Sequence, residues 1–297
     1  MHPTASYGQT ELPRTLQHAR LSLLGAALLW SLAGIFIKFL SLPPLTIVFY
    51  RSLFASLFFA FFIRRSAVLP WTLLLVSAVS YTAAISAFVS ANKITTAANA
   101  IALQYTAPIF VFVIVHFFYR DTIGSVTWVS LVVGMVGIAV ICAGSAGQPD
   151  AAGVAIALLS GLLFALYMVG LRHLKEVSPG TLTFLNNVVC CVLLLPFLRG
   201  ELSLSFNEGW IVALMGVIQL GIPYWLFSKG LEKIPVQEAS LLVLIEPVLN
   251  PIWVALAVGE VPSKATVIGG SLIIASLGFR YLWQLVNPHA KTFCAEG

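Results

Sequence analysis

The feature that most constrains this chain is an internal repeat. From Ala100 onward, residues recur in kind 139 positions later, and the equivalent pairs are Ala100 and Ala239, Pro108 and Pro247, Asp121 and Glu260, Ser130 and Gly269, and Gly137 and Ser276. The earlier part repeats at an offset of 134 to 135, which pairs Trp30 with Phe164, Lys38 with Arg172, Pro44 with Pro179, and Phe49 with Phe184. The fold must therefore be built from two similar halves.

The composition places both halves in a membrane. Hydrophobic residues make up 59% of the chain, charged residues only 9%, and the mean hydropathy is +0.97, whereas soluble domains carry about 25% charged residues. A helix needs about 20 residues to cross the hydrocarbon core. Uncharged runs of that order cover 66–92, 94–119, 122–149, 151–171, 177–198 and 209–228. Backbone groups in lipid must bond to one another, and apolarity without alternation favours helices over a barrel.

We expect ten transmembrane helices, near 21–40, 43–63, 69–90, 96–117, 123–144, 151–172, 179–198, 209–229, 236–257 and 263–284. Each repeat then holds five, an odd number, so the second repeat enters the bilayer from the opposite side. The predicted fold class is an all-α integral membrane protein of two inverted five-helix repeats, an arrangement typical of secondary transporters. The predicted division is a cytoplasmic tail over 1–20, repeats over 21–146 and 151–284, and a cytoplasmic tail over 285–297.

The Lys and Arg residues indicate the orientation. With the N-terminus inside, four lie at outer flanks and eleven at inner flanks, namely Arg14, Arg20, Arg64, Arg65, Arg120, Arg172, Lys175, Lys229, Lys233, Arg280 and Lys291. We therefore predict a multi-pass protein of the cell (inner) membrane with both termini cytoplasmic. The net charge of +5 is a signal of this topology, and no nucleic-acid partner is expected.

Several short motifs follow one another at a fixed spacing. The second half carries Glu246-Pro247, then Gly259-Glu260, then Gly269-Gly270 before Leu272-Ile273; the first carries Leu28-Leu29-Trp30, Phe49-Tyr50-Arg51 and Ala107-Pro108. Together they resemble the EamA domain of the drug/metabolite transporter superfamily, over about 21–284. The first half departs from the pattern, with Asp121 where Glu is usual and Ala107 opposite Glu246. The resemblance implies a ten-helix carrier of small metabolites, whose members handle amino acids, other metabolites and drugs.

Two ionisable residues, Arg51 and Glu246, lie deep within predicted spans, where a charge costs about 2.5–3.5 kcal/mol on insertion scales. We expect Glu246 to face the protein interior as a substrate-binding or proton-linked carboxylate. Arg51 is then its partner or an anchor for anionic groups. The alternatives are a buried structural pair, or an arginine that snorkels to the outer face. Asn250 lies four residues after Glu246, on the same helix face, and both it and Arg51 are candidate substrate-binding residues beside Glu246.

Aromatic residues supply the other candidates for a binding site. We expect a central cavity between the two halves, lined by Trp30, Tyr105, Phe164, Tyr224 and Glu246, because inverted repeats bind substrate near the midplane where they meet. Trp30 and Phe164 occupy matched positions, which should bring both toward the symmetry axis. The alternative for these aromatic residues is ordinary packing or an interfacial belt.

Other residues have structural interpretations. Pro108 and Pro247, at matched positions in mid-helix, should bend both helices. Asp121, Glu238 and Glu260 are interpreted as solvated helix ends. Small residues suited to close helix packing are Ser130, Gly134, Gly137, Gly269, Gly270, Ala275 and Ser276.

The function favoured by the sequence is secondary transport of a small organic metabolite, an amino acid or related solute, across the cytoplasmic membrane by alternating access. The alternatives are a different solute class (a drug, an organic anion or a nucleotide-like metabolite) or a membrane-embedded enzyme. The enzyme is disfavoured because the spans contain no acidic cluster and no Gly-x-Ser-x-Gly turn. The expected partners are a small-molecule substrate, the lipid bilayer and, as candidate coupling ion, a proton. The four cysteines form no CxxC pair, and neither metal nor cofactor is expected.

Overall fold

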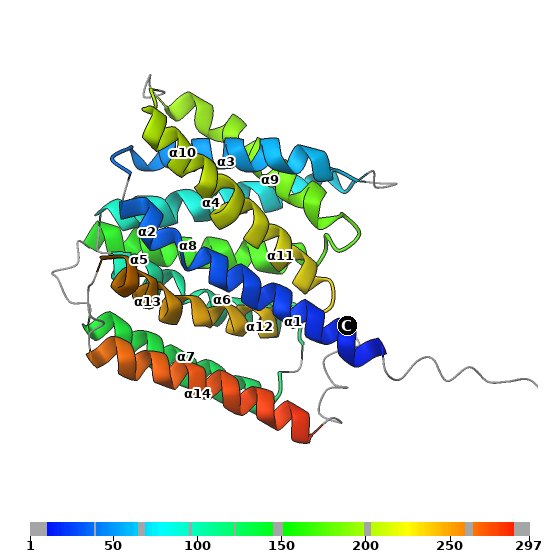
Figure 1. Ribbon diagram of the computed structural model, residues 1–297. Coiled ribbons are helices and arrows are strands. Elements are labelled where there is room, and N and C mark those ends of the chain that lie inside the picture. The colour runs from blue at the N-terminus through cyan, green and yellow to red at the C-terminus, as the bar shows by residue number, and fades with distance from the viewer. Residues whose placement is uncertain are drawn as a thin grey trace, which may run out of the picture.

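The computed structural model describes residues 11–38, 40–64, 69–94, 97–121, 123–144, 151–198, 203–258 and 264–287. Throughout these ranges the regular structure is helical (Figure 1). Glu260, residues 1–10 of the first predicted tail and 288–297 of the second lie outside the described residues.

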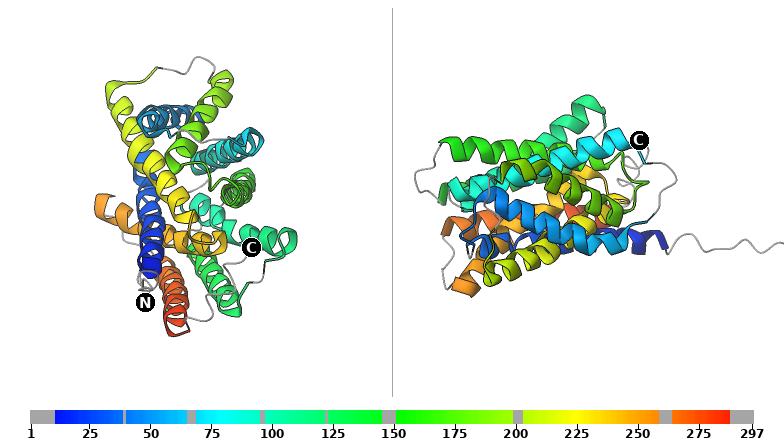
Figure 2. Two further views of the ribbon diagram at one scale, coloured as in Figure 1. Left: turned by 90° about the vertical axis from the view of Figure 1, so that its right-hand side faces the viewer. Right: turned by 90° about the horizontal axis from the view of Figure 1, so that it is seen from above.

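The first repeat comprises α1 (Glu11–Trp30), α2 (Ala33–Lys38), α3 (Pro44–Phe59), η1 (Ala60–Phe62), α4 (Trp71–Ile94), α5 (Ala97–Gln104), α6 (Ala107–Phe118) and α7 (Ser125–Gly144). The second comprises α8 (Ala151–Leu171), α9 (Pro179–Leu194), η2 (Leu195–Phe197), α10 (Phe206–Leu214), the π-helical η3 (Met215–Gly221), α11 (Ile222–Leu231), α12 (Val236–Leu242), η4 (Val243–Ile245), α13 (Glu246–Val258) and α14 (Lys264–Val286). Figures 1 and 2 show one elongated bundle in which successive spans run in opposite directions. The end at which α1 begins and α14 ends, on the right in Figure 1, is here the terminal face, and the other end is the opposite face.

Eight helical stretches of the described chain are long and apolar enough to cross a membrane. They are Thr15–Ile37, Pro44–Phe62, Trp71–Ile94, Ser125–Gly144, Ala151–Leu171, Pro179–Phe197, Phe206–Leu231 and Lys264–Trp283. All eight fall on predicted spans, although α1 begins at Glu11, before the predicted start at residue 21. The two remaining predicted spans, 96–117 and 236–257, are each divided into shorter helices.

Those two divided helices break at matched positions. The helix α6 begins at Ala107 and α13 begins at Glu246, and each start lies one residue before Pro108 or Pro247. Proline lacks an N–H group and its ring clashes with the preceding turn, so an α-helix cannot continue through it undisturbed. The α-helix is interrupted before both prolines, by a turn at Tyr105 and Thr106 in the first repeat and by η4 in the second.

The surface of the bundle is apolar. Large hydrophobic side chains exposed on it include Phe61, Phe117, Val132, Leu256 and Leu282. Such extensive apolar exposure is unfavourable in water and matches the acyl chains of a bilayer, where only polar groups need shelter.

Contacts between helices are preserved when the two repeats are exchanged. Exchange converts α1 and α2 into α8, α3 into α9, α4 into α10 to α11, and α7 into α14. The contact of α4 with α8 has its counterpart in that of α11 with α1, and the contact of α4 with α9 in that of η3 with α3. The pairs α3 with α9 and α7 with α14 are their own counterparts, and both are present.

The pair α7 and α14 shows this symmetry residue by residue. The Ser130 hydroxyl donates to the carbonyl oxygen of Ser276 at 3.2 Å, and Gly137 packs on Gly269. The 139-residue offset converts the first pair into the second, and the pairing is antiparallel. A Cβ atom on Gly137 would lie 2.7 Å from the carbonyl oxygen of Gly269. The predicted packing through small residues is therefore confirmed at this crossing.

Gly269→Ala should destabilise the protein by about 1–3 kcal/mol, as overpacking does, because the new Cβ atom would meet the backbone oxygen of Gly137. Gly278 on the same helix is the matched control, since a Cβ atom there has nothing within 4 Å. Thermal unfolding of both variants in detergent measures the difference. Equal melting temperatures would contradict the close crossing of α7 and α14.

Candidate functional site

A cavity of about 30 Å³ lies inside the bundle. Its lining residues are Trp30, Arg51, Ile85, Phe88, Gln104, Tyr105, Phe164, Gln219, Leu220, Tyr224 and Glu246. Six of the seven residues proposed from the sequence are among them. Each of the six comes from a different helix or helix break, three from each repeat. The cavity therefore lies where the two repeats meet.

Glu246 joins the two broken helices. Its side chain is 5% exposed, and its carboxylate accepts a hydrogen bond from the Tyr105 hydroxyl. Tyr105 lies in the turn between α5 and α6, while Glu246 is the first residue of α13. The break in each repeat is thus tied to the break in the other at the wall of the cavity, and Glu246 faces the protein interior.

Arg51 lines the same cavity from α3 and is 2% exposed. Among the described residues no ion pair joins it to Glu246, and its Nε atom has no hydrogen-bond partner. The two buried ionisable side chains therefore line one cavity without an ion pair between them in the described part of the chain, and Arg51 does not snorkel to the outer face.

Five of the eleven lining residues are aromatic. The matched residues Trp30 and Phe164 are in edge contact, with ring centroids 5.7 Å apart. Tyr224 packs on Trp30 at 4.9 Å and on Tyr81 at 4.7 Å. Edge-to-face pairs at these distances are the favoured arrangement of aromatic side chains. The resulting surface is apolar and offers ring faces to a bound molecule.

Asn250 does not line the cavity. Its amide donates to the carbonyl oxygen of Ser31 at 2.9 Å, and Trp253 donates to the Ser31 hydroxyl oxygen at 2.7 Å. Ser31 lies in the turn between α1 and α2, where a helical hydrogen bond is missing. Asn250 thus supplies a hydrogen-bond donor to the Ser31 carbonyl oxygen at a third helix break. A buried carbonyl oxygen without a partner would be costly.

Gln219 lies in the π-helical segment η3, which the sequence did not predict. Its amide nitrogen donates to the Trp30 carbonyl oxygen at 3.4 Å, while its side-chain oxygen has no partner among the residues that the structure describes. Single turns of π-helix occur often at functional sites. Here the extra residue in the turn carries a polar group to the cavity wall.

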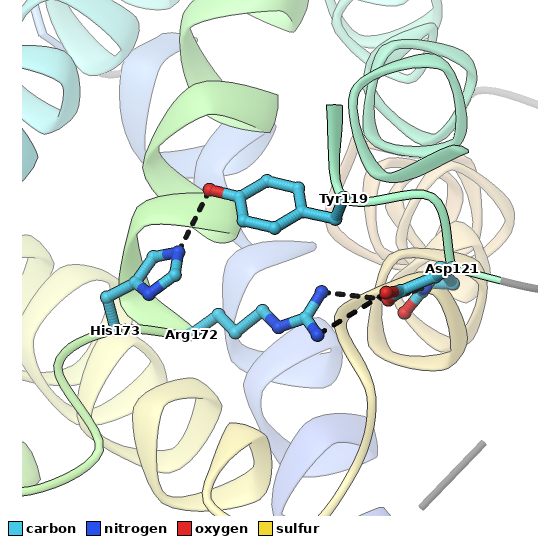
Figure 3. Close-up of polar contacts among 5 residues, drawn as sticks. Tyr119, Asp121, Arg172 and His173 are labelled. Atoms are coloured by element: carbon cyan, nitrogen blue, oxygen red, sulfur yellow. Dashed lines mark hydrogen bonds and ion pairs between the residues drawn. The ribbon is translucent and has the colours of Figure 1, made fainter. Parts of the chain in front are cut away.

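Ion pairs close the bundle at the terminal face (Figure 3). Arg172 at the end of α8 pairs with Asp121 at 2.8 Å, and Tyr119 bonds to His173 at 2.9 Å. Gln237 at the start of α12 also donates to Asp121 at 3.3 Å. The next residue, Glu238, is bound by Arg20 at 2.8 Å and Arg280 at 3.2 Å. The interpretation of Glu238 as a solvated helix end is wrong, since it is 8% exposed.

The model of the EamA-like transporter family matches residues 19–143 and again residues 151–281, once over each repeat. The chain belongs to the EamA-like transporter family. It is thus a multi-pass membrane transporter of that family, as the resemblance of its motifs implied.

Relatives of this transporter agree in name and length. An "Uncharacterized transporter" of Archaeoglobus fulgidus is 26% identical over 266 residues, which cover 89% of this chain and 96% of the relative. The "Uncharacterized transporter YxxF" of Bacillus subtilis is 26% identical over 279 residues, covering 89% and 88%. A solved crystal structure matches with a TM-score of 0.77 at 18% identity, covering 90% of this chain and 97% of that one. That match establishes the fold of the transporter.

Sequence reasoning missed one polar group of this transporter. Asn186 and Asn187 on α9 are 1% and 0% exposed, and they bind the hydroxyls of Tyr167 and Tyr81. Two consecutive amides within an apolar span were the available signal, since amides facing lipid would lack partners.

Proposed function

We propose that this EamA-like protein is a secondary transporter that moves a small organic metabolite, an amino acid or related solute, by alternating access. The observation that carries the proposal is the convergence of Trp30, Arg51, Tyr105, Phe164, Tyr224 and Glu246 on one cavity between the repeats. The cavity of about 30 Å³ has room for about one water molecule. Admission of a solute therefore requires the two repeats to move apart at one face.

An amino acid suits the chemistry of this wall. The Arg51 guanidinium is buried and unpaired at Nε, so it offers donors to a carboxylate. Across the cavity, the Glu246 carboxylate offers an acceptor to an ammonium group. The aromatic wall supplies apolar contact for a side chain. A drug or an organic anion would use only part of this set.

The proposed architecture has ten spans in two inverted repeats, with both termini cytoplasmic. It is supported by the exchange symmetry of the helix contacts and by the Lys and Arg of the terminal face. Cysteines placed at Lys233 and Ser41, both exposed, test the orientation in a variant without native cysteines. An impermeant thiol reagent added to intact cells should label Ser41→Cys only. Labelling of Lys233→Cys alone would show that the protein has the reverse of the proposed orientation.

Transport itself is tested with purified protein in liposomes and a panel of labelled L-amino acids, organic anions and nucleosides. We expect uptake of at least one amino acid. Trp30→Ala and Phe164→Ala should each weaken its apparent affinity by about tenfold, since aromatic contacts are worth about 0.5–1.5 kcal/mol beyond their buried area. Protein levels in the membrane are measured in parallel.

Two outcomes count against this function. Normal affinity in both well-expressed variants would refute the aromatic cavity as the binding site. Uptake of anions or nucleosides, but of no amino acid, would show that the proposed solute class is wrong. The protein would still be a transporter.

Coupling to protons is proposed through Glu246, the buried carboxylate at the cavity wall. Glu246→Gln keeps the shape of the side chain and cannot release a proton. It should therefore abolish the pH dependence of transport while the protein remains folded. Glu208→Gln is the control, because Glu208 caps the start of α10 at the opposite face and glutamine retains that capping role. An unchanged pH profile in Glu246→Gln would leave Glu246 with a structural role.

A further inference from the structure

Three tyrosines separate the cavity from the terminal face. Tyr224, at the cavity wall, packs on Tyr81 at 4.7 Å and on Tyr167 at 5.7 Å. The ring centroids of Tyr81 and Tyr167 lie 5.4 Å apart, and each residue is 1% exposed. Tyr81 and Tyr167 present their hydroxyls to α9, where the Tyr81 hydroxyl donates to Asn187 at 3.0 Å and the Asn186 amide donates to the Tyr167 oxygen at 3.2 Å.

The two asparagines differ in how well they are satisfied. The oxygen of Asn187 accepts from Tyr81, and its nitrogen donates to the carbonyl oxygen of Thr183 at 2.8 Å. The side-chain oxygen of Asn186 is buried and has no partner within the part of the chain that the structure describes. A buried acceptor left unpaired costs about 1–3 kcal/mol, so such a group in a native protein requires an explanation.

The repeat supplies that explanation. The offset of 135 that aligns Pro44 with Pro179 also aligns Arg51 with Asn186. Each lies seven residues after the first residue of its helix, α3 or α9. Because α3 begins at the opposite face and α9 at the terminal face (Figure 1), the two side chains lie at equal depths from opposite faces. Both carry a buried polar atom without a partner, Nε of Arg51 and Oδ1 of Asn186.

A second, smaller hollow of about 10 Å³ lies beyond Asn186, at the terminal face. Its lining includes Lys175, Leu182, Ser228 and Glu232. Leu182 lies one turn before Asn186 on α9, and Ser228 lies one turn after Tyr224 on α11, so each shares a helix face with its neighbour. The hollow, whose lining is otherwise apolar, thus lies one helical turn from Asn186 along α9 and one turn from Tyr224 along α11.

We infer that Asn186 is a second solute-binding residue, the counterpart of Arg51 on the path to the terminal face. This inference rests on the proposed transport function. When the repeats open toward the terminal face, the free acceptor of Asn186 receives a hydrogen bond from the ammonium group of the solute. Arg51 serves the carboxylate on the side of the opposite face. The exchange of repeats thus converts a cation that binds the carboxylate into an acceptor that binds the ammonium.

The test is transport of the best-transported amino acid, measured from each face of vesicles that contain Asn186→Leu. KM for solute presented at the terminal face should rise about tenfold, the loss of one hydrogen bond to a charged group. KM at the opposite face should stay within about twofold of wild type. A carrier cannot change the equilibrium distribution of solute between the two sides, so the ratio of maximal rate to KM must change equally in both directions. With an unchanged maximal rate from the terminal face, the maximal rate from the opposite face must therefore fall about tenfold.

Asn187→Leu is the matched control, because it removes two satisfied hydrogen bonds from an adjacent, equally buried amide. It should reduce the amount of folded protein without a one-sided change in KM. If Asn186→Leu does not fold, Asn186→Ala takes its place. An unchanged KM at the terminal face, with wild type active, overturns the inference and leaves the proposed function standing.

A second measurement needs no solute and separates the two failures. Asn186→Cys, in protein without other cysteines, should react with a charged methanethiosulfonate added at the terminal face. Met168→Cys, beside Tyr167 on α8 and 0% exposed, should stay unreactive. Failure of Asn186→Cys to react from that face overturns the path past Asn186, whatever the wild type transports.

Discussion

Lipid offers no hydrogen bonds, so a helix that breaks inside a membrane must find partners for its backbone within the protein. This chain breaks helices at matched prolines, Pro108 and Pro247, and again at Ser31. Each break is buried against another. Tyr105 reaches Glu246 across the first two, and Asn250 with Trp253 serves the third. Two of these breaks reach the cavity, because Tyr105 and Glu246 both line it.

The backbone follows the repeat more closely than the polar side chains do. Ser130 with Ser276 and Gly137 with Gly269 are interchanged by the 139-residue offset, which gives both halves the same packing. The residues at the cavity depart from it, with Ala107 matched to Glu246. In the proposed alternating access, a symmetric scaffold would give two equivalent ways to open, one at each face. The unequal side chains of the proposed site would then hold a single solute in one orientation.

The sequence predicted those parts of the fold that depend on composition and on the repeat. The apolar runs, the matched breaks at Pro108 and Pro247, and the small residues of α7 and α14 follow from local chemistry that neighbours cannot override. It also brought Trp30 and Phe164 together, because matched positions near a two-fold axis must approach each other. It did not predict which face of a helix points where. Asn250 shares a helix face with Glu246 in the sequence, yet it serves Ser31 because the break in the first helix lies beside it. The π-helical turn that carries Gln219 has no local signature in the sequence, and Asn186 acquires its meaning only from Tyr167 and from its match to Arg51.

Burial of Arg51 and Glu246 in one cavity without an ion pair has an energetic consequence. Ionising either group in a medium of low dielectric is costly, and a direct pair between them would offset part of that cost. It would also occupy both groups, so a solute would have to break the pair before it could bind. Kept apart, with Glu246 held by Tyr105, the two groups retain a part of their desolvation cost that only a molecule with complementary charges can offset. The terminal face shows the contrary case. There Glu238 is bound by both Arg20 and Arg280, and its charge is satisfied by the protein alone. Satisfied ion pairs therefore hold the ends of the helices together, whereas Arg51 and Glu246 in the proposed binding site have no such pair among the described residues.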